Sequence, residues 1–471
     1  MDDDGTEILT FDSLVLLLSY LPVTDLLNAS LVRKTWNVAA NTPSLWRCAC
    51  RRRWLFFNSR AVCGSASWKE YFLWREKLEK SMASGIPGAD FKCKSLRGHA
   101  GKISGLCYVG QRQVDVQPRE LRSLVCSVCT DKTLRVWDVY EGTCLWRSPE
   151  QAAELTAVVS VPSLCLLASG SRSGHVSLWS AENGQCMASQ LKPNPGVASM
   201  MSIEDKFRSI LVGDWMGHLH VLSLPDLEIK HSATVFSDVR IDHIGLSSDK
   251  TLISLASKED RSGSSLMIYP TEQVLHPPED PREAVKLPLP VESFLAACWL
   301  PLRPARLAAL FRDGIEQSVH IWDLQLKKDK YHTNINVAAV GNITPLNSFP
   351  PGLLSCWGES VIFTTSRSTL QMWNVFGKAL STFTHHREPI TDIHVDCIRV
   401  ATCAEDLSLH VYTWDQVPEG PATLSSCYSL LGGSKTMFRT FTKVVCDYSS
   451  IVGVVEGLDG KGVLKAYSFQ I

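Results

Sequence analysis

The stretch from Ser127 to Asp138 constrains the fold of this chain more than any other part of the sequence. Two runs rich in β-forming residues flank a tight turn at Asp131, and a Gly-His pair that ends at His99 lies upstream. This arrangement is typical of one four-stranded blade of a β-propeller. An aspartate in the turn can accept a hydrogen bond from the histidine ring, and a serine hydroxyl and a tryptophan N–H can extend the line. The residues that we expect to form this buried structural chain are His99, Ser127, Asp131 and Trp137.

Looser copies of this unit recur as far as the last residues of the sequence. Their third strands are expected to end near Trp137, Trp179, Leu222, Ile268, Trp322, Trp373, Tyr412 and Tyr467. The intervals between them are close to the roughly 40–45 residues of a propeller blade, with insertions in some loops. Several copies lack the polar residues of the first one, so we expect them to depend on apolar packing between neighbouring sheets.

The two ends of the repeat array predict how the ring closes. Residues 91–96 read as an outer strand with no preceding partner, and residues 463–469 read as a third strand with no successor. We expect the first of these strands to complete the last blade, because closure removes the free sheet edges. This count predicts an all-β propeller of eight blades. Seven blades remain an alternative, because the copies between residues 223 and 350 are degenerate.

Composition excludes several classes of function. The net charge is −1 over 471 residues, which gives no reason to expect nucleic acid as a partner. No run reaches the roughly 18 apolar residues of a membrane span, so no membrane partner is expected. The acidic start, from Met1 to Asp4, is the opposite of a secretory signal, and we expect the cytoplasm or the nucleus.

The cysteines and the other reactive residues do not indicate an enzyme. The 16 cysteines are expected to be reduced, buried and apolar in character in such a compartment. Cys126 and Cys129 have metal-ligand spacing, but residues three apart on a strand point to opposite faces. His385 and His386 are expected to form a polar turn. The sequence has no hydrolase elbow, phosphate loop, zinc-protease or dinucleotide motif, so we predict no catalytic residue, no metal and no cofactor.

The first 53 residues have a different character and predict a small all-α module. Thr10 can cap a helix over residues 11–21, which is apolar nearly all round and is followed by Pro22. Thr24 can cap a second helix, and Thr42 with the proline after it can begin a third. Three short helices cannot bury all of these apolar side chains alone, so a partner protein is implied.

This segment resembles an F-box. The resemblance lies in a Leu-Pro pair at Leu21, an Asp-Leu-Leu run ending at Leu27, an Ala-Ser-Leu-Val run ending at Val32, then Trp36 and the Leu-Trp-Arg run around Trp46. It departs at the start, where Leu-Thr-Phe replaces the usual Leu-Pro. In the family this motif binds the Skp adaptor of a cullin-RING ubiquitin ligase. The resemblance implies as contact or support residues Leu9, Leu17, Leu21, Pro22, Leu26, Leu27, Val32, Trp36 and Trp46.

The predicted domains are the F-box at 1–53, a helical spacer at 54–90 and the WD-repeat propeller at 91–471. The combination resembles the F-box/WD-repeat proteins. The runs Val212–Asp214, Leu224–Leu227 and Ala297–Trp299 resemble one subgroup of them, that of the twelfth-numbered member and its rodent-expanded relatives. The family implies a non-catalytic substrate receptor of an SCF ubiquitin ligase, which binds the Skp adaptor, and through it the cullin-RING ligase, together with an unknown protein substrate. The alternatives are a propeller scaffold without ligase function and, less in keeping with the sequence, a propeller hydrolase.

Three arginines are candidates for substrate binding. In a blade of this type, the residue just before the turn aspartate lies at the rim of one face. Arg172 and Arg367 occupy such places, and Arg312 begins the comparable turn of another blade. Guanidinium groups that converge on one rim would bind a carboxylate-rich or phosphorylated segment. The alternative is that the three lie in scattered, solvated turns.

Overall fold

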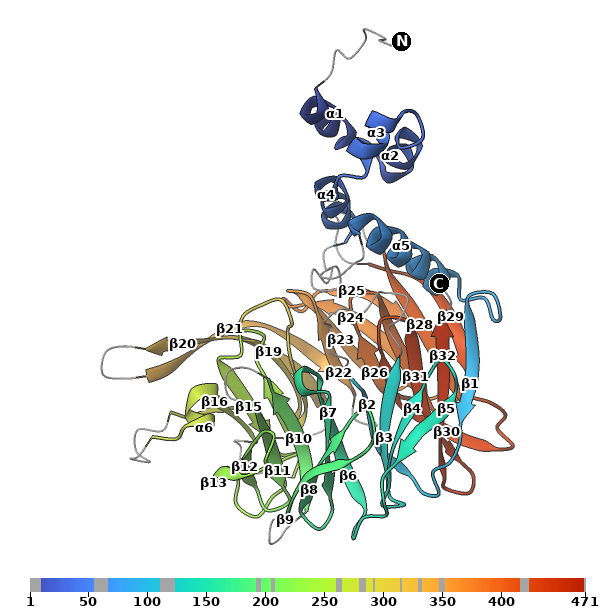
Figure 1. Ribbon diagram of the computed structural model, residues 1–471. Helices are drawn as coiled ribbons and strands as arrows, with labels where there is room; N and C mark the ends of the chain where they lie inside the picture. The colour runs from blue at the N-terminus through green and yellow to red at the C-terminus, as the bar shows by residue number, and fades with distance from the viewer. Residues whose placement is uncertain are drawn as a thin grey trace, which may run out of the picture.

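The computed structural model describes the N-terminal helices and a ring of β-sheets (Figure 1). The described residues are 10–54, 67–110, 123–191, 196–204, 208–259, 265–278, 285–290, 293–313, 316–328, 333–346, 352–415 and 423–469. Within these residues there are eight four-stranded antiparallel sheets. The protein is therefore an eight-bladed β-propeller preceded by a helical module, and the eight-blade prediction is confirmed.

Blades 1 to 7 are simple meanders, in which strands that are neighbours in the sequence pair in the sheet. Blade 1 consists of β2 (Ile103–Tyr108), β3 (Leu124–Cys129), β4 (Leu134–Asp138) and β5 (Thr143–Arg147), and blade 2 of β6 (Leu155–Val161), β7 (Leu166–Ser171), β8 (His175–Ser180) and β9 (Cys186–Leu191). Blade 3 consists of β10 (Val197–Ile203), β11 (Ser209–Asp214), β12 (His218–Ser223) and β13 (Ile229–Thr234), and blade 4 of β14 (His243–Leu246), β15 (Leu252–Ala256), β16 (Leu266–Pro270) and β17 (Leu287–Leu289). A short helix, α6 (Thr271–Leu275), follows β16.

The second half of the ring continues this order and closes on the first strand of the chain. Blade 5 consists of β18 (Phe294–Trp299), β19 (Arg306–Asp313), β20 (Glu316–Lys328) and β21 (Thr333–Leu346), and blade 6 of β22 (Leu354–Trp357), β23 (Val361–Ser366), β24 (Thr369–Asn374) and β25 (Ala379–Phe383). Blade 7 consists of β26 (Ile390–Val395), β27 (Arg399–Ala404), β28 (Ser408–Asp415) and β29 (Thr423–Leu431), and blade 8 of β30 (Phe438–Cys446), β31 (Ser450–Gly457), β32 (Gly462–Phe469) and β1 (Phe91–Leu96). The strand β1 pairs antiparallel with β32, with Phe91 opposite Phe469. This is the predicted closure.

The innermost strands are linked by hydroxyl groups that reach the next blade. Thr156 Oγ1 donates to the carbonyl of Val197 at 2.7 Å, and Thr391 Oγ1 donates to that of Phe441 at 2.8 Å. The hydroxyl groups of Ser104 and Ser199 make the same kind of hydrogen bond, to the backbone carbonyls of Leu155 and Ile241 respectively. Where blade 8 meets blade 1, the ammonium group of Lys443 donates to the carbonyl of Ser104 instead. Because each such bond crosses between blades, the set holds the inner ring together.

One pair of cysteines departs from the expectation that all are reduced. Cys298 on β18 and Cys356 on β22 form a disulfide between the innermost strands of blades 5 and 6, with their Cα atoms 6.3 Å apart. Adjacent innermost strands bring the two residues within bonding range although 58 positions separate them in the sequence. Pairing of strands in different blades is not visible in a local pattern, so the sequence did not indicate it.

The helical module has one helix more than predicted. Its helices are α1 (Phe11–Leu18), α2 (Val23–Ala29), α3 (Lys34–Ala40), α4 (Pro43–Arg53) and, as the spacer, α5 (Trp68–Ser84). The predicted cap at Thr10 is present, since Thr10 Oγ1 accepts from the amide of Ser13. The predicted cap at Thr24 is wrong, because α2 begins at Val23 and Pro22 is its N-cap residue. Thr42 is the N-cap residue of α4, without a side-chain hydrogen bond. Helix α1 ends before Leu21, in keeping with the preference of a residue before proline for an extended backbone. Trp36 lies in α3, where the Asn37 side chain donates to the carbonyl of Ser30 at 2.8 Å and ties α3 to α2.

Candidate functional site

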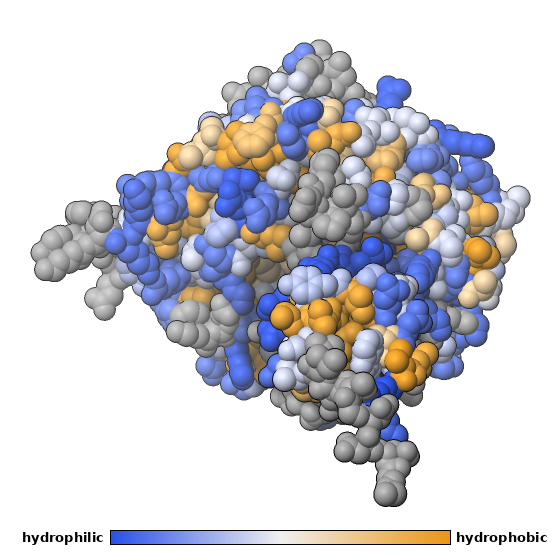
Figure 2. All heavy atoms as spheres, turned by 90° about the horizontal axis from the view of Figure 1, so that it is seen from above, coloured by the Kyte–Doolittle hydropathy of each residue, from blue (hydrophilic) through white to orange (hydrophobic). Residues whose placement is uncertain are grey.

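The helical module leaves a large apolar surface uncovered. Its inner side is a cluster that includes Leu14, Leu26 and Trp46, all less than 10% exposed. Its outer side carries large apolar side chains that are at least one third exposed, namely Phe11, Leu16, Leu17, Tyr20, Leu21, Leu31, Val32 and Val38. Seen from above, the molecule shows hydrophobic patches between its polar atoms (Figure 2). Four of these eight side chains lie on α1 and α3 and four in the connections that follow α1 and α2, and together they form a surface that fits a protein partner.

The residues predicted to meet an adaptor fall into two groups. Leu17, Leu21, Pro22 and Val32 are exposed and are available for direct contact. Leu26 and Trp46 are buried inside the module, Leu27 and Trp36 are half-buried against the same cluster, and these four support the outer surface. Leu9 lies outside the described residues. The assignment of all nine to an adaptor stays a prediction.

Sequence reasoning missed the most exposed members of this surface. Leu31 is 82% exposed and Tyr20 is 74% exposed, and neither was among the predicted contacts. Both lie in the short connections that follow α2 and α1. For Tyr20 the available signal was the apolar character of residues 11–21 all round the helix, which meant that some of these side chains would face outward. That signal does not extend to Leu31.

Helix α5 joins this module to the propeller through a buried arginine. Ser67 and Glu70 form a reciprocal capping box at its start. Farther along, the Arg75 side chain is 1% exposed, and its guanidinium lies 4.5 Å from the centre of the Trp54 ring and 5.8 Å from that of Tyr448. Glu79 pairs with Arg75 at 3.1 Å. One cation thus contacts the end of the F-box-like segment, the spacer helix and the propeller.

The same joint continues into blades 7 and 8. The rings of Trp74 and Tyr448 stack with their centres 4.9 Å apart, and Leu78 packs in a cluster with Ile398. Tyr448 lies in the turn between β30 and β31, and Ile398 lies in the turn between β26 and β27. We call the side of the disc that carries these first-to-second-strand turns the module face. The module stands on it, as Figure 1 also shows.

The opposite side carries the turns between the second and third strands, and we call it the distal face. Arg172, Arg312 and Arg367 all lie at such turns, in blades 2, 5 and 6. They therefore share one face of the disc. Arg172 and Arg367 are exposed and Arg312 is half-buried. The structure does not gather the three at one point, since they stand on separate blades.

The distal face groups Arg172 with two residues that the sequence did not indicate. The guanidinium of Arg172 lies 5.6 Å from the centre of the Trp215 ring, and that of Arg240 lies 5.8 Å from it. Arg172 also pairs with Glu154 at 3.4 Å, and Arg240 pairs with Asp242 at 2.7 Å. The half-exposed Trp215 ring between these two guanidinium groups could give a bound segment both an apolar and a cationic contact.

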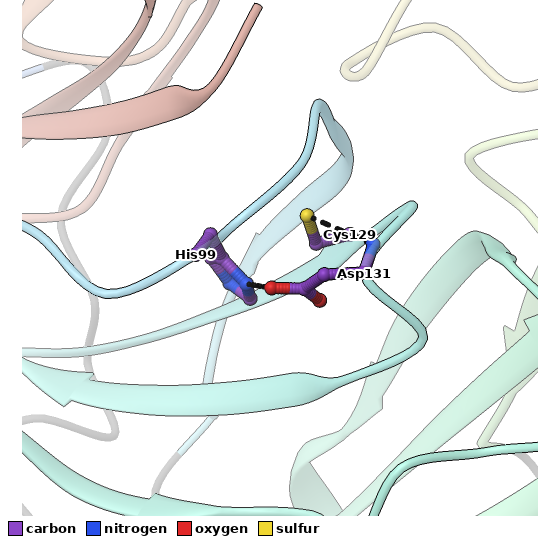
Figure 3. Close-up of side chains that lie close together, drawn as sticks. All are labelled: His99, Cys129 and Asp131. Carbon is purple, nitrogen blue, oxygen red and sulfur yellow. Dashed lines mark hydrogen bonds and ion pairs between the residues drawn. The ribbon is translucent and has the colours of Figure 1, made fainter.

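The four residues predicted to form a polar chain do lie in one line in blade 1. Trp137 Nε1 donates to Ser127 Oγ at 2.8 Å, and this hydroxyl lies 2.8 Å from His99 Nε2. The other ring nitrogen of His99 is 2.9 Å from Asp131 Oδ2. Cys129 lies beside them, and its sulfur accepts from the amide of Asp131 (Figure 3). Because both nitrogens of His99 are engaged within the chain, the group is structural and is not arranged to hold a metal.

The polar chain predicts an acid-sensitive contribution to stability. Burial raises the pKa of Asp131, but hydrogen bonds from His99, Thr133 and the amide of Ala100 outweigh it and hold this pKa well below its ordinary value. The contribution is therefore complete above the unfolded-state pKa of about 3.9 and is lost as the pH falls toward the folded-state value. We expect Asp131→Ala to cost about 1–3 kcal/mol at neutral pH.

Thermal unfolding as a function of pH measures this contribution. The gap between wild type and Asp131→Ala should narrow below about pH 4. The control is Asp459→Ala, at the corresponding but exposed turn of blade 8, which should leave the melting temperature almost unchanged. Equal melting temperatures for wild type and Asp131→Ala at pH 7 would show that the polar chain does not stabilise the blade.

Blade 7 contains a second polar chain that the sequence analysis did not identify. His386 Nε2 lies 2.8 Å from Thr402 Oγ1, and its Nδ1 lies 3.0 Å from Ser408 Oγ and 3.4 Å from Asp406. Threonine here replaces the serine of blade 1, and Tyr412 replaces its tryptophan. These substitutions concealed the pattern, and the expected polar turn at His386 proves to be a buried structural group.

Comparison with known proteins agrees with this geometry. Residues 12–52 match the model of the F-box-like family, and residues 91–138 match that of the WD domain, G-beta repeat. The chain is 24% identical to mouse F-box/WD repeat-containing protein 15, with 97% of each chain covered. It is 26% identical to human F-box/WD repeat-containing protein 12, with 96% of this chain and 97% of that one covered.

Among solved structures, the fold is similar to that of the computationally designed Ika8 protein. The TM-score is 0.57 at 15% identity, over 81% of this chain and the whole of the other. At that identity the likeness concerns the fold alone.

A helical F-box followed by WD-type blades defines the class of F-box/WD-repeat proteins. The chain has this organisation, and over nearly its whole length it is similar to mouse protein 15 and human protein 12.

F-box/WD-repeat proteins are generally adaptors rather than enzymes, and the matched families are not catalytic ones. In the described part of the chain, no helix is both long enough and apolar enough to cross a membrane.

Proposed function

We propose that this protein is the substrate-recognition subunit of an SCF ubiquitin ligase. The F-box-like module would bind the Skp adaptor, and through it the cullin-RING ligase, while the propeller would hold a protein substrate. The observation that carries this proposal is the exposed apolar surface of the module, which stands on one face of a propeller whose opposite face carries arginines. Acting in the cytoplasm or nucleus, the chain would contribute proximity and choice of target rather than chemistry, which is an effect of local concentration.

Affinity purification of the intact protein beside a version that lacks residues 9–53 tests this proposal. The adaptor and the cullin should be recovered with the intact protein and lost from the shortened one. Proteins that bind both versions are the substrate candidates. Recovery of the adaptor with the shortened version at the level of the intact protein would contradict the proposed role of the module.

The distal face is the proposed position of the substrate. Its arginines suit a carboxylate-rich or phosphorylated segment, because a guanidinium binds such groups through two hydrogen bonds at once. We expect the double change Arg172→Glu and Arg367→Glu to abolish recovery of the substrate candidates while the adaptor is still bound. Comparative mass spectrometry of the purified complexes measures both quantities.

The matched control for this charge reversal is Arg303→Glu on the module face, where Arg303 lies in the connection between β18 and β19. This variant should keep both the adaptor and the substrate candidates. Retention of all candidates by the double variant would show that the distal arginines are only solvated turn residues.

A further inference from the structure

The outer strand of blade 5 differs from the other outer strands in the described ring. β21 has 14 residues, whereas the others have between 3 and 9. Between Thr333 and Leu346 it contains no charged residue. It stands last in its sheet, so its outer side presents peptide groups that no other described strand pairs with. A long, uncharged edge of this kind is a template for pairing with another strand.

Four of the other outer strands carry features that oppose such pairing, while β5, β9 and β25 have only five, six and five residues. β1 contains Lys92 and Lys94, β13 contains Lys230, and β17 is short and contains Pro288. β29 is contacted by helix α5. Lysine, proline, short length and cover are the usual protections of a sheet edge. β21 has none of them along its first half.

The open part of β21 is its N-terminal half. At Gly341 the turn of blade 6 comes so close that a Cβ atom there would lie 2.1 Å from the carbonyl oxygen of Val375. Residues 333–339 lie before this point, on the ribbon formed by β20 and β21 that projects beyond the disc (Figure 1). Among the described strands, none pairs with the outer side of this stretch.

The ribbon is fixed in position by blade 4 on one of its broad faces. Leu324 and Ile335 belong to a buried cluster with Leu289, and Lys328 forms an ion pair with Glu272 of α6. Val337 is two residues from Ile335 and so lies on the same face, yet it is 41% exposed. The cluster therefore ends at the open edge with an apolar side chain that has no cover on one side.

We propose that two copies of this chain associate through β21, paired antiparallel about a two-fold axis at Asn336. In this register Asn336 faces Asn336 of the second copy, and Val337 of each copy lies opposite Ile335 of the other. Both copies would then extend the same apolar cluster across the new sheet. A second copy fits better than an unrelated segment, because it supplies both apolar residues in register and brings no charge against an uncharged edge.

The pairing can be tested through the residue on the axis. Asn336 is exposed, so Asn336→Lys and Asn336→Asp should fold normally but place like charges opposite each other. By analytical ultracentrifugation, the full-length wild type should sediment as a dimer, and each variant alone should have half that mass. Mixing the two variants in equal amounts should restore the dimer, because opposite charges then face each other.

The matched control is Thr234→Lys, an exposed position on the outer strand β13 of blade 3, which should remain dimeric. A wild type that is monomeric at every concentration measured would overturn the proposal and leave the edge open to a segment of another protein. A dimer that survives Asn336→Lys, or variants that stay monomeric when mixed, would also overturn it.

Discussion

Replacing Arg75 with alanine is expected to destabilise the joint between the helical module and the propeller. The side chain is 1% exposed and contacts Trp54, Tyr448 and Glu79 at once. Removing one partner of a fully buried ion pair costs about 3–5 kcal/mol, because it leaves the other charge without its counterion. Glu79 is 17% exposed, so we expect a cost near the lower end of that range. We expect a lower melting temperature and, by small-angle X-ray scattering, a broader distribution of distances as the module moves on the disc.

The control for this experiment lies on the same helix. Lys80 pairs with Glu76, but its side chain is 75% exposed, so Lys80→Ala should change neither the melting temperature nor the scattering curve. A melting temperature and a scattering curve for Arg75→Ala that match those of wild type would show that the joint does not depend on this cation.

Replacing Leu31 with glutamate should weaken binding of the Skp adaptor without unfolding the module. The side chain is 82% exposed, so the variant has no packing to lose in the free protein. In a complex that covers this surface, the new carboxylate would be buried among apolar groups. A central contact of this type contributes about 2–4 kcal/mol, which corresponds to about 30- to 1000-fold weaker binding.

Titration of purified adaptor against the full-length protein measures this loss. Phe376→Glu is the matched control, because Phe376 is 72% exposed but lies in the turn between β24 and β25 of the propeller. It should bind the adaptor as wild type does. By contrast, truncation of Leu26, which is buried in the module, would test the stability of the module rather than the contact.

Much of the propeller could be predicted because each blade repeats a local signal. Trp179, Trp322 and Trp373 mark third strands in the sequence, and β8, β20 and β24 contain them. The closure by β1 followed from two unpaired ends. The disulfide at Cys298 and the hydroxyl bonds between innermost strands could not be predicted in this way, because they join residues of different blades.

The candidate sites were predictable only in part. The resemblance to a motif indicates residues such as Leu26, but it does not show which side chains face inward. The outward position of Leu31 depends on the packing of α2 against α3, which is not visible in the sequence. The place of Arg172 on the distal face followed from the blade pattern. Its neighbours Trp215 and Arg240 lie on another blade and in the connection that follows it, so only the ring geometry brings them together.

The most direct test of the proposed function combines recruitment with transfer. Wild type and Leu31→Glu should be expressed in the same cells, and the proteins bound to each should be identified together with their ubiquitin conjugation. We predict that the variant loses the adaptor and the cullin, keeps the substrate candidates, and lowers the ubiquitin conjugation of at least one of them. Adaptor binding at the wild-type level, or unchanged conjugation of every retained protein, would contradict a substrate receptor and favour a scaffold without ligase function.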